Sequence, residues 1–465
     1  MATGEDRTVL SGLAMRLFQL MSEKATSRQW TEWIEAPLEH AVAEGDTDLA
    51  WTLLKAAANG GPGWKGCDDR TLLHAAAESG NTEVIRTVLD IEGVGEVDAV
   101  SGHEGRTALH YAAAGGHADA GRVMMFAGAK VDLVDAEGST ALHHAIKSGC
   151  LRLAEDMVIA GADVRAKDRR GNTPLHHAAA HDDPSFTCRL LRRGAFVSAP
   201  NKQEQQPLHI AVRMGRVGVA KALLKAGADP NVLCTEGNPT LRFSPLFLAR
   251  RNAAMTSTLV GMGADVTSVD NIGYSALHWA IRDGRSEVVD TLIEVGADVE
   301  ARTSQMICYY SDGGHPMKGM TPLHEAAYQG KYSSMLILLQ KGRANANAQD
   351  EDGHSPLHIL CMNPQVCTAA ACGDILLRSG ADETAIDVDG HTPADIMESS
   401  EGHNGRLQRL LVNAPADRAW RRRGLLAVLR AQGVQAENEA TTDAVLHRLM
   451  GLQSEALFRH IVRFL

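Results

Sequence analysis

The stretch Gly171-Asn172-Thr173-Pro174-Leu175-His176-His177-Ala178-Ala179 reads as a turn that leads directly into a short helix. Gly171 permits the positive φ of a tight turn. Thr173 can cap the N-terminus of a helix, and Pro174 suits the first helical position, where no backbone N–H is needed. The apolar residues that follow recur at i, i+3 and i+4 and therefore share one helical face: Leu175, Ala178 and Ala179. Small alanines on that face let a neighbouring helix approach closely.

The Thr-Pro-Leu-His motif of this stretch recurs along the chain. Related tetrapeptides begin at equal steps, at Thr107, Thr140, Thr173 and Gln206. Weaker or offset copies begin at seven further positions: Ala36, Thr71, Ser244, Ser275, Thr321, Ser355 and Thr392. A glycine that can end a second short helix follows six of these starts at a constant spacing: Gly128, Gly161, Gly194, Gly227, Gly296 and Gly342. Because a pair of short helices cannot bury its apolar face alone, the repetition predicts units that stack into a one-dimensional solenoid.

This pattern resembles the ankyrin repeat, a family with a period of about 33 residues and a Thr-Pro-Leu-His-x-Ala motif. The resemblance covers residues 36–412, as about eleven units, and implies an all-α solenoid of stacked helix-turn-helix units joined by hairpin turns. We expect helical flanks on both sides: an N-terminal cap over residues 1–35 and a C-terminal helical segment over residues 413–465. The C-terminal helices either cover the last repeat or bind a second protein, and the sequence leaves both alternatives open.

Two steps of the repeat exceed the period by five residues or more. The step from Gln206 to Ser244 has five extra residues, and the step from Ser275 to Thr321 has thirteen. The larger excess falls near residues 302–317. An insertion of that length in a compact array predicts a surface loop on the side of the hairpin turns.

Composition and charge narrow the class of protein. The chain has 465 residues, of which 44% are hydrophobic and 22% charged, as in a typical folded protein. Its formal charge of −11 makes it a poor binder of nucleic acid or of an anionic membrane. No apolar run approaches the ~18 residues of a membrane span, and the N-terminus lacks the basic and apolar series of a signal peptide. Eight cysteines without secretory context indicate reduced thiols, so we expect the protein in the cytoplasm or the nucleus.

The sequence predicts no enzymatic activity, no cofactor and no small-molecule substrate. It contains neither a phosphate-binding loop, nor a nucleophile elbow, nor the motifs of a kinase. His324-Glu325 looks like the start of a zinc-protease motif, but Tyr328 stands where the second histidine is needed. The resemblance implies a structural role for the repeat histidines, which bond the turn of their own unit: His74, His110, His143, His176, His209, His278, His324 and His358. In the last unit Asp395 takes their place, which suits a terminal cap.

One cluster has the residue types of a zinc site. His358, Cys361, Cys367 and Cys372 are separated by two, five and four residues, which is not the spacing of a known finger or ribbon. His358 is also a repeat histidine, and Cys361 takes the place of a small packing alanine. The sequence leaves metal binding by these residues open, and we assign no metal site.

The resemblance also implies where a partner binds. Ankyrin stacks contact proteins through the tips of their hairpin turns and through the two residues that end each first helix, which line a concave face. Carried over unit by unit, this predicts the following partner-binding residues: Arg106, Lys147, Arg169, Arg170, Arg213, Met214, Arg251, Tyr274, Arg282, Met320 and Tyr328. Most of them are basic, which favours an acidic partner. A cation at a helix C-terminus also interacts favourably with the helix dipole, by ~0.3–1 kcal/mol, so a purely local role stays open.

These features together favour a non-enzymatic scaffold or adaptor that binds a protein, and in particular an acidic segment, on its concave face. The alternative is a substrate receptor of a ubiquitin ligase that docks through its C-terminal helices. Residues 413–465 have the position and the helical pattern for that role, but they lack the Leu-Cys and Leu-Pro-Leu-Pro elements of a SOCS-type box. Nucleic-acid binding through the arginines would depend steeply on salt, and the net charge counts against it.

Overall fold

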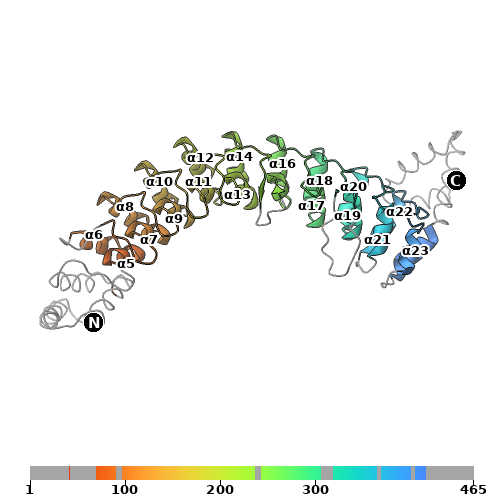
Figure 1. Cartoon of the computed structure of the whole chain (residues 1–465), viewed down its shortest axis with the longest axis horizontal. Coiled ribbons are helices and arrows are strands. Elements are labelled where there is room, and N and C mark those ends of the chain that lie inside the picture. Colours follow the sequence, from red (N-terminus) through yellow and green to blue (C-terminus); the bar gives the residue numbers. More distant parts are fainter. Residues whose placement is uncertain are drawn as a thin grey trace, which may run out of the picture. The chain divides into compact units, whose positions relative to one another are not determined.

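Pairs of short helices succeed one another along the chain (Figure 1). The computed structural model describes residues 41, 70–90, 97–235, 242–304, 318–363, 368–399 and 404–414. The first helix of each pair begins at the Thr-Pro-Leu-His motif: α5 (Leu72–Ser79), α7 (Ala108–Gly115), α9 (Ala141–Lys147), α11 (Pro174–Ala178), α13 (Pro207–Arg213), α15 (Pro245–Leu248), α17 (Ala276–Arg282), α19 (Pro322–Tyr328), α21 (Pro356–Met362) and α23 (Pro393–Ser399). The second helices are α6 (Thr82–Asp90), α8 (Ala118–Phe126), α10 (Leu151–Ile159), α12 (Pro184–Arg192), α14 (Val217–Lys225), α16 (Ala253–Gly261), α18 (Ser286–Glu294), α20 (Tyr332–Gln340) and α22 (Ala369–Arg378). A last described helix spans 405–414.

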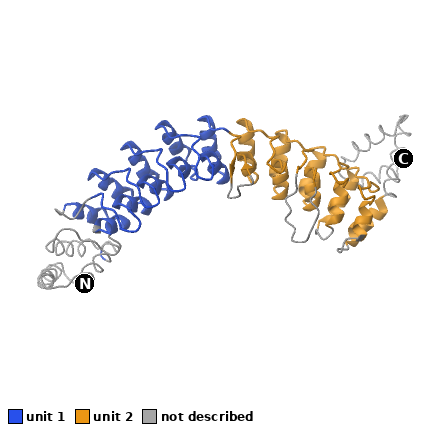
Figure 2. Cartoon of the chain, viewed as in Figure 1, with its two compact units in different colours: residues 1–229 blue, residues 230–465 orange. Residues whose placement is uncertain are grey.

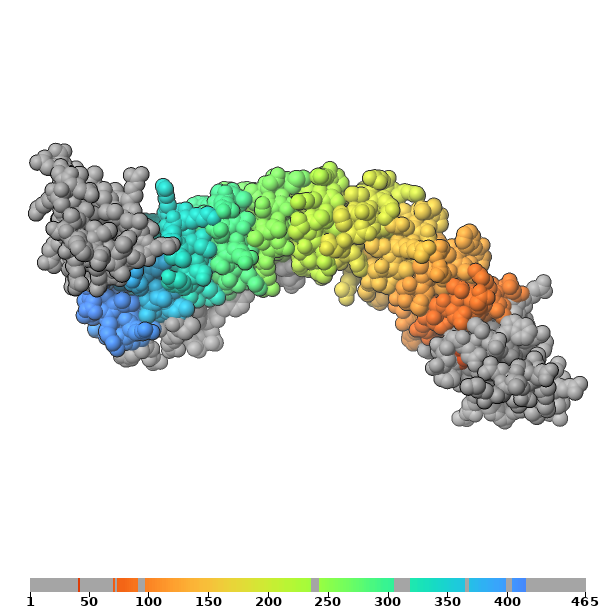
Figure 3. Space-filling model, turned by 180° about the vertical axis from the view of Figure 1, so that it is seen from behind, coloured from red at the N-terminus to blue at the C-terminus, as the bar shows by residue number. Residues whose placement is uncertain are grey.

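The helices form two compact units, residues 1–229 (unit 1) and residues 230–465 (unit 2), which Figure 2 shows in different colours. Within each unit the first helices of successive repeats pack side by side, as α7 does with α5 and with α9. In the space-filling view of Figure 3, successive repeats of each unit lie directly against one another. The predicted all-α fold of stacked helix-turn-helix units is thereby confirmed. No helix among the described residues is both long enough and apolar enough to cross a bilayer.

The core of each unit runs between neighbouring repeats. In unit 1 the motif leucines Leu109, Leu142, Leu175 and Leu208 are almost wholly buried, at 1% exposure or less. The second helices add larger side chains at equivalent positions: Met124, Met157, Leu190 and Leu223. Because every repeat covers the apolar face of the one before it, the core lengthens with each repeat and has no single centre.

The hairpin turns are joined to one another by backbone hydrogen bonds. In unit 1 the N–H of Arg169 donates to the carbonyl of Glu137 (2.7 Å), and the N–H of Lys202 donates to that of Arg170 (3.0 Å). Gly171 makes this approach possible. Its φ is +80°, and a Cβ there would lie 3.0 Å from the backbone nitrogen of Lys202. Glycine at this position therefore serves two purposes: it allows the positive φ of the turn, and it leaves room for the next turn.

Most repeat histidines bond their own helix cap and also the next repeat. Nδ1 of His143 accepts a hydrogen bond from the backbone N–H of Thr140 (3.1 Å), and its Nε2–H donates to the carbonyl of Asn172 (3.3 Å). Seven of the repeat histidines make both bonds: His74, His110, His143, His176, His278, His324 and His358. The predicted structural role of these histidines is confirmed, and the bond to the following repeat adds to it.

The structure departs from the purely helical expectation at the longer step between Gln206 and Ser244. There a short antiparallel pair forms between β1 (Cys234–Thr235) and β2 (Arg242–Phe243), in the register Cys234 with Phe243. The extra residues lengthen one hairpin turn, which gives its two arms enough chain to pair as strands. The expected N-terminal cap over 1–35, most of the expected insertion (305–317) and residues 415–465 of the expected C-terminal segment lie outside the described residues.

Candidate protein-binding surface

Four of the predicted partner-binding residues line one pocket of unit 1: Arg106, Lys147, Arg169 and Arg170. The pocket has a volume of about 250 Å³. Residues of two successive hairpin turns, 135–139 and 168–172, form its walls together with residues of α9. We call it the turn pocket. The sequence places these four residues in three successive repeats, and the stacking brings them together.

The two most buried carboxylates of the turn pocket are occupied by hydrogen bonds within the protein. Asp135 accepts backbone N–H bonds from its own turn at 2.9 and 2.8 Å, and a bond from Nε2 of His144 at 2.7 Å. Asp168 repeats this arrangement one repeat later, with Nε2 of His177 at 3.0 Å. Burial alone would raise the pKa of Asp135, but the bonds from His144 and from the turn outweigh it and hold that pKa below its usual value. Both carboxylates therefore stay ionised and fix the shape of the turns.

The positive charge of the turn pocket comes from its lysine and arginines. Burial lowers the pKa of His144 despite its bond to a carboxylate, so this imidazole is neutral at pH 7. Arg169 pairs with the exposed Glu137 at 3.2 Å. Lys147 and Arg170 are exposed, and neither forms an ion pair with another residue in the part of the chain that the structure describes. These two cations are available to a partner.

The two predicted residues of unit 1 outside the turn pocket lie at the surface. Arg213 and Met214 end α13, and both are exposed. Arg106, by contrast, is half-buried and pairs with Glu104 at 3.1 Å. The exposure of Lys147, Arg213 and Met214 at the ends of first helices agrees with the expectation. Arg106, in contrast, is partly engaged by contacts within the protein.

In unit 2 the predicted cations are held by the protein itself. Arg251 pairs with Asp283 at 3.1 Å, and this carboxylate also accepts a bond from Arg250 at 2.9 Å. Arg282 lies over the ring of Trp279, with its guanidinium carbon 5.5 Å from the ring centre. These contacts stabilise unit 2 locally and leave less of its positive charge for a partner.

Two predicted contact residues of unit 2 are buried, which corrects their assignment to an accessible surface. Tyr274 is 3% exposed and donates a hydrogen bond from its hydroxyl to Glu325 (3.3 Å), while Met320 is 2% exposed. Burial raises the pKa of both Tyr274 and Glu325. Tyr274 was predicted from its place at a turn, but its ring packs into the repeat. Tyr328, the last of the predicted residues, is half-buried at the end of α19.

The cluster with zinc-ligand residue types has its histidine engaged elsewhere. Nδ1 of His358 accepts a bond from the N–H of Ser355 (3.0 Å), and its Nε2 donates to the carbonyl of His391 (3.2 Å). Cys361 is buried, and burial raises the pKa of its thiol to about 12, which disfavours the thiolate that a metal needs. Cys367 lies outside the described residues. His358 could bind a metal only by giving up a bond that holds the fold.

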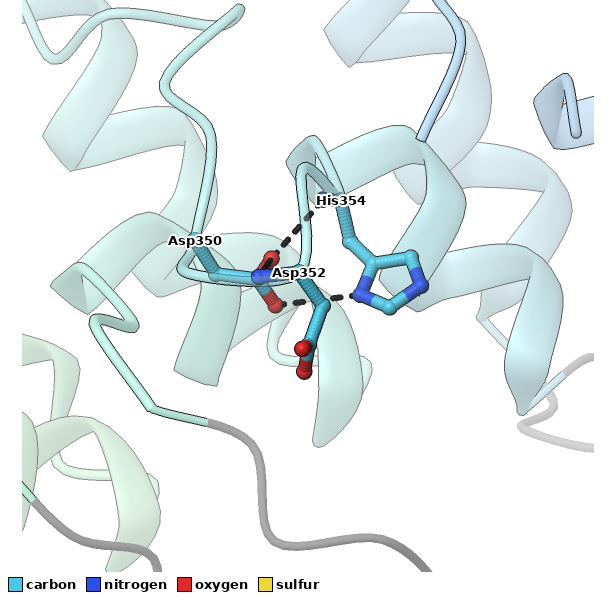
Figure 4. Close-up of side chains that lie close together, drawn as sticks. All are labelled: Asp350, Asp352 and His354. Atoms are coloured by element: carbon cyan, nitrogen blue, oxygen red, sulfur yellow. Dashed lines mark hydrogen bonds and ion pairs between the residues drawn. The ribbon is translucent and has the colours of Figure 1, made fainter. Parts of the chain in front are cut away.

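Asp350, Asp352 and His354 gather in a hairpin turn of unit 2 (Figure 4). Asp350 accepts backbone bonds from Asp352 (3.0 Å) and His354 (2.7 Å), and its other oxygen accepts one from Nδ1 of His354 (3.2 Å). Asp135 and Asp168 make the same backbone bonds in their own turns. The cluster is therefore the ordinary turn of this repeat, with its carboxylate already satisfied.

Sequence reasoning missed the carboxylates of the turn pocket. Asp135 and Asp168 are one repeat apart, and each is followed nine residues later by its histidine, His144 or His177. That double recurrence was a readable signal. It is weaker than the signal of the repeat histidines His143 and His176, which recur together with the whole motif.

Comparisons with known proteins agree with the repeat. A family model described as "Ankyrin repeats (3 copies)" matches residues 38–135, 94–168, 142–234 and 233–303, and one described as "Ankyrin repeats (many copies)" matches residues 316–360. Similar curated proteins include the target of rapamycin complex 2 subunit AVO2 of Saccharomyces cerevisiae, 31% identical over 28% of this chain and 28% of that protein. Human Rabankyrin-5 is 36% identical over 25% of this chain and 10% of its own length.

Human ankyrin repeat and SOCS box protein 3 is 30% identical over 32% of both chains. The alignments with these relatives span at most about a third of their length. Among solved structures, the ankyrin repeat domain of human ASB11 covers 49% of this chain and 99% of its own, at 26% identity and a TM-score of 0.43.

Proposed function

Because the chain belongs to the ankyrin-repeat family, whose repeats serve as protein-interaction modules, we propose that it is a non-enzymatic scaffold or adaptor that binds an acidic segment of a partner. The contact surface we assign is the face of unit 1 that carries the turn pocket and the helix end at Arg213. One observation carries this choice: Lys147 and Arg170 line the same pocket, are exposed, and have no ion pair among the described residues. Positive side chains of this kind attract and orient an acidic partner.

Unit 2 supports the proposal by contrast. Its predicted cations Arg251 and Arg282 lie against Asp283 and Trp279. A partner would have to compete with these contacts, whereas Lys147 and Arg170 can be approached directly. We therefore place the main contact in unit 1.

The test is an affinity pull-down from native lysate with quantitative mass spectrometry. Wild type is compared with Lys147→Glu/Arg170→Glu and with a control of equal charge change, Lys221→Glu/Lys225→Glu. The control lysines are exposed on α14, the second helix of a repeat in the same unit. We expect the partner to be lost with the first variant only. A partner that both variants retain, or that both lose equally, would refute the assigned surface.

The second candidate is a substrate receptor of a ubiquitin ligase. The observation that favours it is the similarity to the ankyrin repeat and SOCS box protein 3, although that alignment covers only 32% of this chain. In this proposal residues 413–465 recruit the ligase. Full-length protein and a truncation ending at Ala414 are compared for co-purification of cullin or elongin subunits. Recovery that depends on the last residues supports the receptor, and no recovery with the full chain refutes it.

We further propose that the protein works in the cytoplasm or the nucleus. Among the described residues, Cys150, Cys188 and Cys361 are free thiols, and Cys361 is buried. A buried free thiol such as that of Cys361 fits a reducing compartment. Cell fractionation with an antibody against the protein tests this directly.

A further inference from the structure

We propose that the turn pocket receives one anionic side chain of the partner, a carboxylate or a phosphate ester, between Lys147 and Arg170. This inference rests on the proposed function and deepens it. The proposed function requires only that an acidic segment lies on this face. The present inference requires that a single acidic group enters the pocket and is bound there by both cations.

The size of the turn pocket fits a single side chain. Its volume is about 250 Å³, whereas sites for drug-sized ligands hold roughly 300–1,000 Å³. Three of its lining residues, Lys147, Arg169 and Arg170, are exposed, so the pocket can be reached from solvent. An extended segment can therefore lie outside the pocket and insert one residue.

The charges of the turn pocket leave two cations for an incoming anion. Asp168 is occupied by four donors: two backbone N–H groups, Nδ2 of Asn172 (3.2 Å) and Nε2 of His177 (3.0 Å). Asp135 is paired with His144 and lies 3.6 Å from Nε of Arg106. The oxygens of both carboxylates are thus engaged by fixed donors of the protein, and the ammonium of Lys147 and the guanidinium of Arg170 form no ion pair with them and remain as donors. Charge-assisted bonds from such groups to carboxylate or phosphate oxygens are the strong ones.

The equivalent place in unit 2 differs in how its cation is held. Asp270 is followed nine residues later by Trp279, whose Nε1–H donates to it at 3.0 Å, as His144 does to Asp135 in unit 1. Arg282 stands at the position of Lys147 and lies over that tryptophan ring. In unit 2 the larger indole stands where unit 1 has an imidazole, and it holds the cation. In unit 1 Lys147 has no such ring contact or ion pair among the described residues.

The experiment measures how fast Lys147 is acetylated in the full chain by a limiting amount of an N-hydroxysuccinimide ester, followed by peptide mass spectrometry. The probes are end-capped glutamate, end-capped phosphoserine and end-capped glutamine. Each is used at about 20 mM and constant ionic strength, where a ligand of similar Kd fills half of the sites. We expect glutamate or phosphoserine to slow acetylation of Lys147 about twofold, and glutamine to leave it unchanged. Lys221 and Lys225 serve as internal references that no probe protects.

A variant at the second cation tests whether the two side chains act together. In Arg170→Met we expect the protection of Lys147 to disappear. In the matched control Arg192→Met, an exposed arginine on α12 of the same unit, protection persists. Circular dichroism and thermal unfolding check that both variants are folded.

The relative protection by glutamate and phosphoserine identifies which acidic group the pocket prefers. Three results overturn the inference: no protection of Lys147 by either acid, equal protection of Lys147 and the reference lysines, or protection that survives Arg170→Met. If the pull-down partner is lost in Lys147→Glu/Arg170→Glu while neither acid protects Lys147, the pocket fails and the proposed binding face stands.

Discussion

The imidazole of a repeat histidine forms hydrogen bonds with two neighbouring repeats. The ring of His143 is 2% exposed and is bonded to Thr140 within its own repeat and to Asn172 in the next. Both bonds require the neutral ring with the proton on Nε2, because Nδ1 accepts from a backbone N–H. The protonation state of the histidine is thus part of the fold.

Replacing this ring has a predictable cost. In His143→Ala the N–H of Thr140 and the carbonyl of Asn172 lose their partner in a buried place, and a cavity replaces the ring. We expect the free energy of unfolding to fall by about 2–4 kcal/mol. Urea titration measures it. The control is His103→Ala, since His103 is exposed and should change stability by less than about 0.5 kcal/mol. Equal effects of the two substitutions would contradict the structural role.

The repeat histidines also predict how stability depends on pH. Burial lowers the pKa of five of them to about 4: His110, His143, His176, His278 and His324. In the unfolded chain a histidine titrates near 6.5. Between these values the unfolded chain binds protons that the folded chain does not, so the free energy of unfolding falls as pH is lowered from about 6.5 to about 4.

Each such histidine contributes up to about 1.4 kcal/mol per pH unit within that window. Urea titrations at several pH values give the slope. In His143→Ala the slope should be smaller by about this amount. A stability that is independent of pH between 4 and 6.5, or an unchanged slope in the variant, would show that the rings are not held neutral.

At the scale of the element, the links that follow or precede the helices depend on glycines for two separable reasons. Gly171 and Gly161 both have a positive φ, +80° and +97°. A Cβ at Gly171 would lie 3.0 Å from a backbone nitrogen of the next turn, whereas a Cβ at Gly161 would meet nothing within 4 Å. The first position combines backbone strain with a close approach, and the second has strain alone.

Alanine substitution separates the two effects. We expect Gly161→Ala to lower the free energy of unfolding by about 1–2 kcal/mol, the cost of a left-handed backbone for an L-residue. Gly171→Ala should lower it further, because the turns must also move apart. Gly261→Ala is the control, since it lies in α16 without a positive φ or a close neighbour, and there alanine favours the helix. Thermal unfolding ranks the three, and equal losses at positions 161 and 171 would contradict the contact between turns.

The elements differ in how far the sequence predicts them. Thr140 and His143 indicate a helix start, because the cap needs those residue types in that order, and the first helices were found in this way. The pair of strands at Cys234 and Phe243 was missed, because a pairing of two residues per strand leaves no alternation to detect. For the turn pocket, the sequence predicts the residues but not the site. Lys147 and Arg170 follow from their places in the repeat, but their presence in one pocket depends on how adjacent repeats stack.

For the whole molecule, the division into two units predicts that a destabilising substitution in one unit lowers stability mainly within that unit. Leu142 is fully buried in unit 1. Leu142→Ala should destabilise its surroundings by about 2–5 kcal/mol. Because each repeat contacts only its neighbours, we expect faster amide hydrogen exchange in α7 to α12 and little change in α17 to α20. Mass spectrometry of exchanged peptides measures both, and an equal increase in both units would indicate one cooperative molecule.

The bond from seven of the repeat histidines to the following repeat has a direction, and the last motif has no such donor. Asp395 accepts bonds from the N–H (2.8 Å) and the hydroxyl (2.6 Å) of Thr392, as a histidine would, but an ionised carboxylate has no hydrogen to donate onward. A gene duplication that copied one whole repeat inside the array would join new and old repeats through donors and acceptors already in register. A copy added after this motif would lack the hydrogen bond that a histidine donates to the following repeat. Duplication inside the array therefore preserves the bonds between repeats, and addition after Asp395 does not.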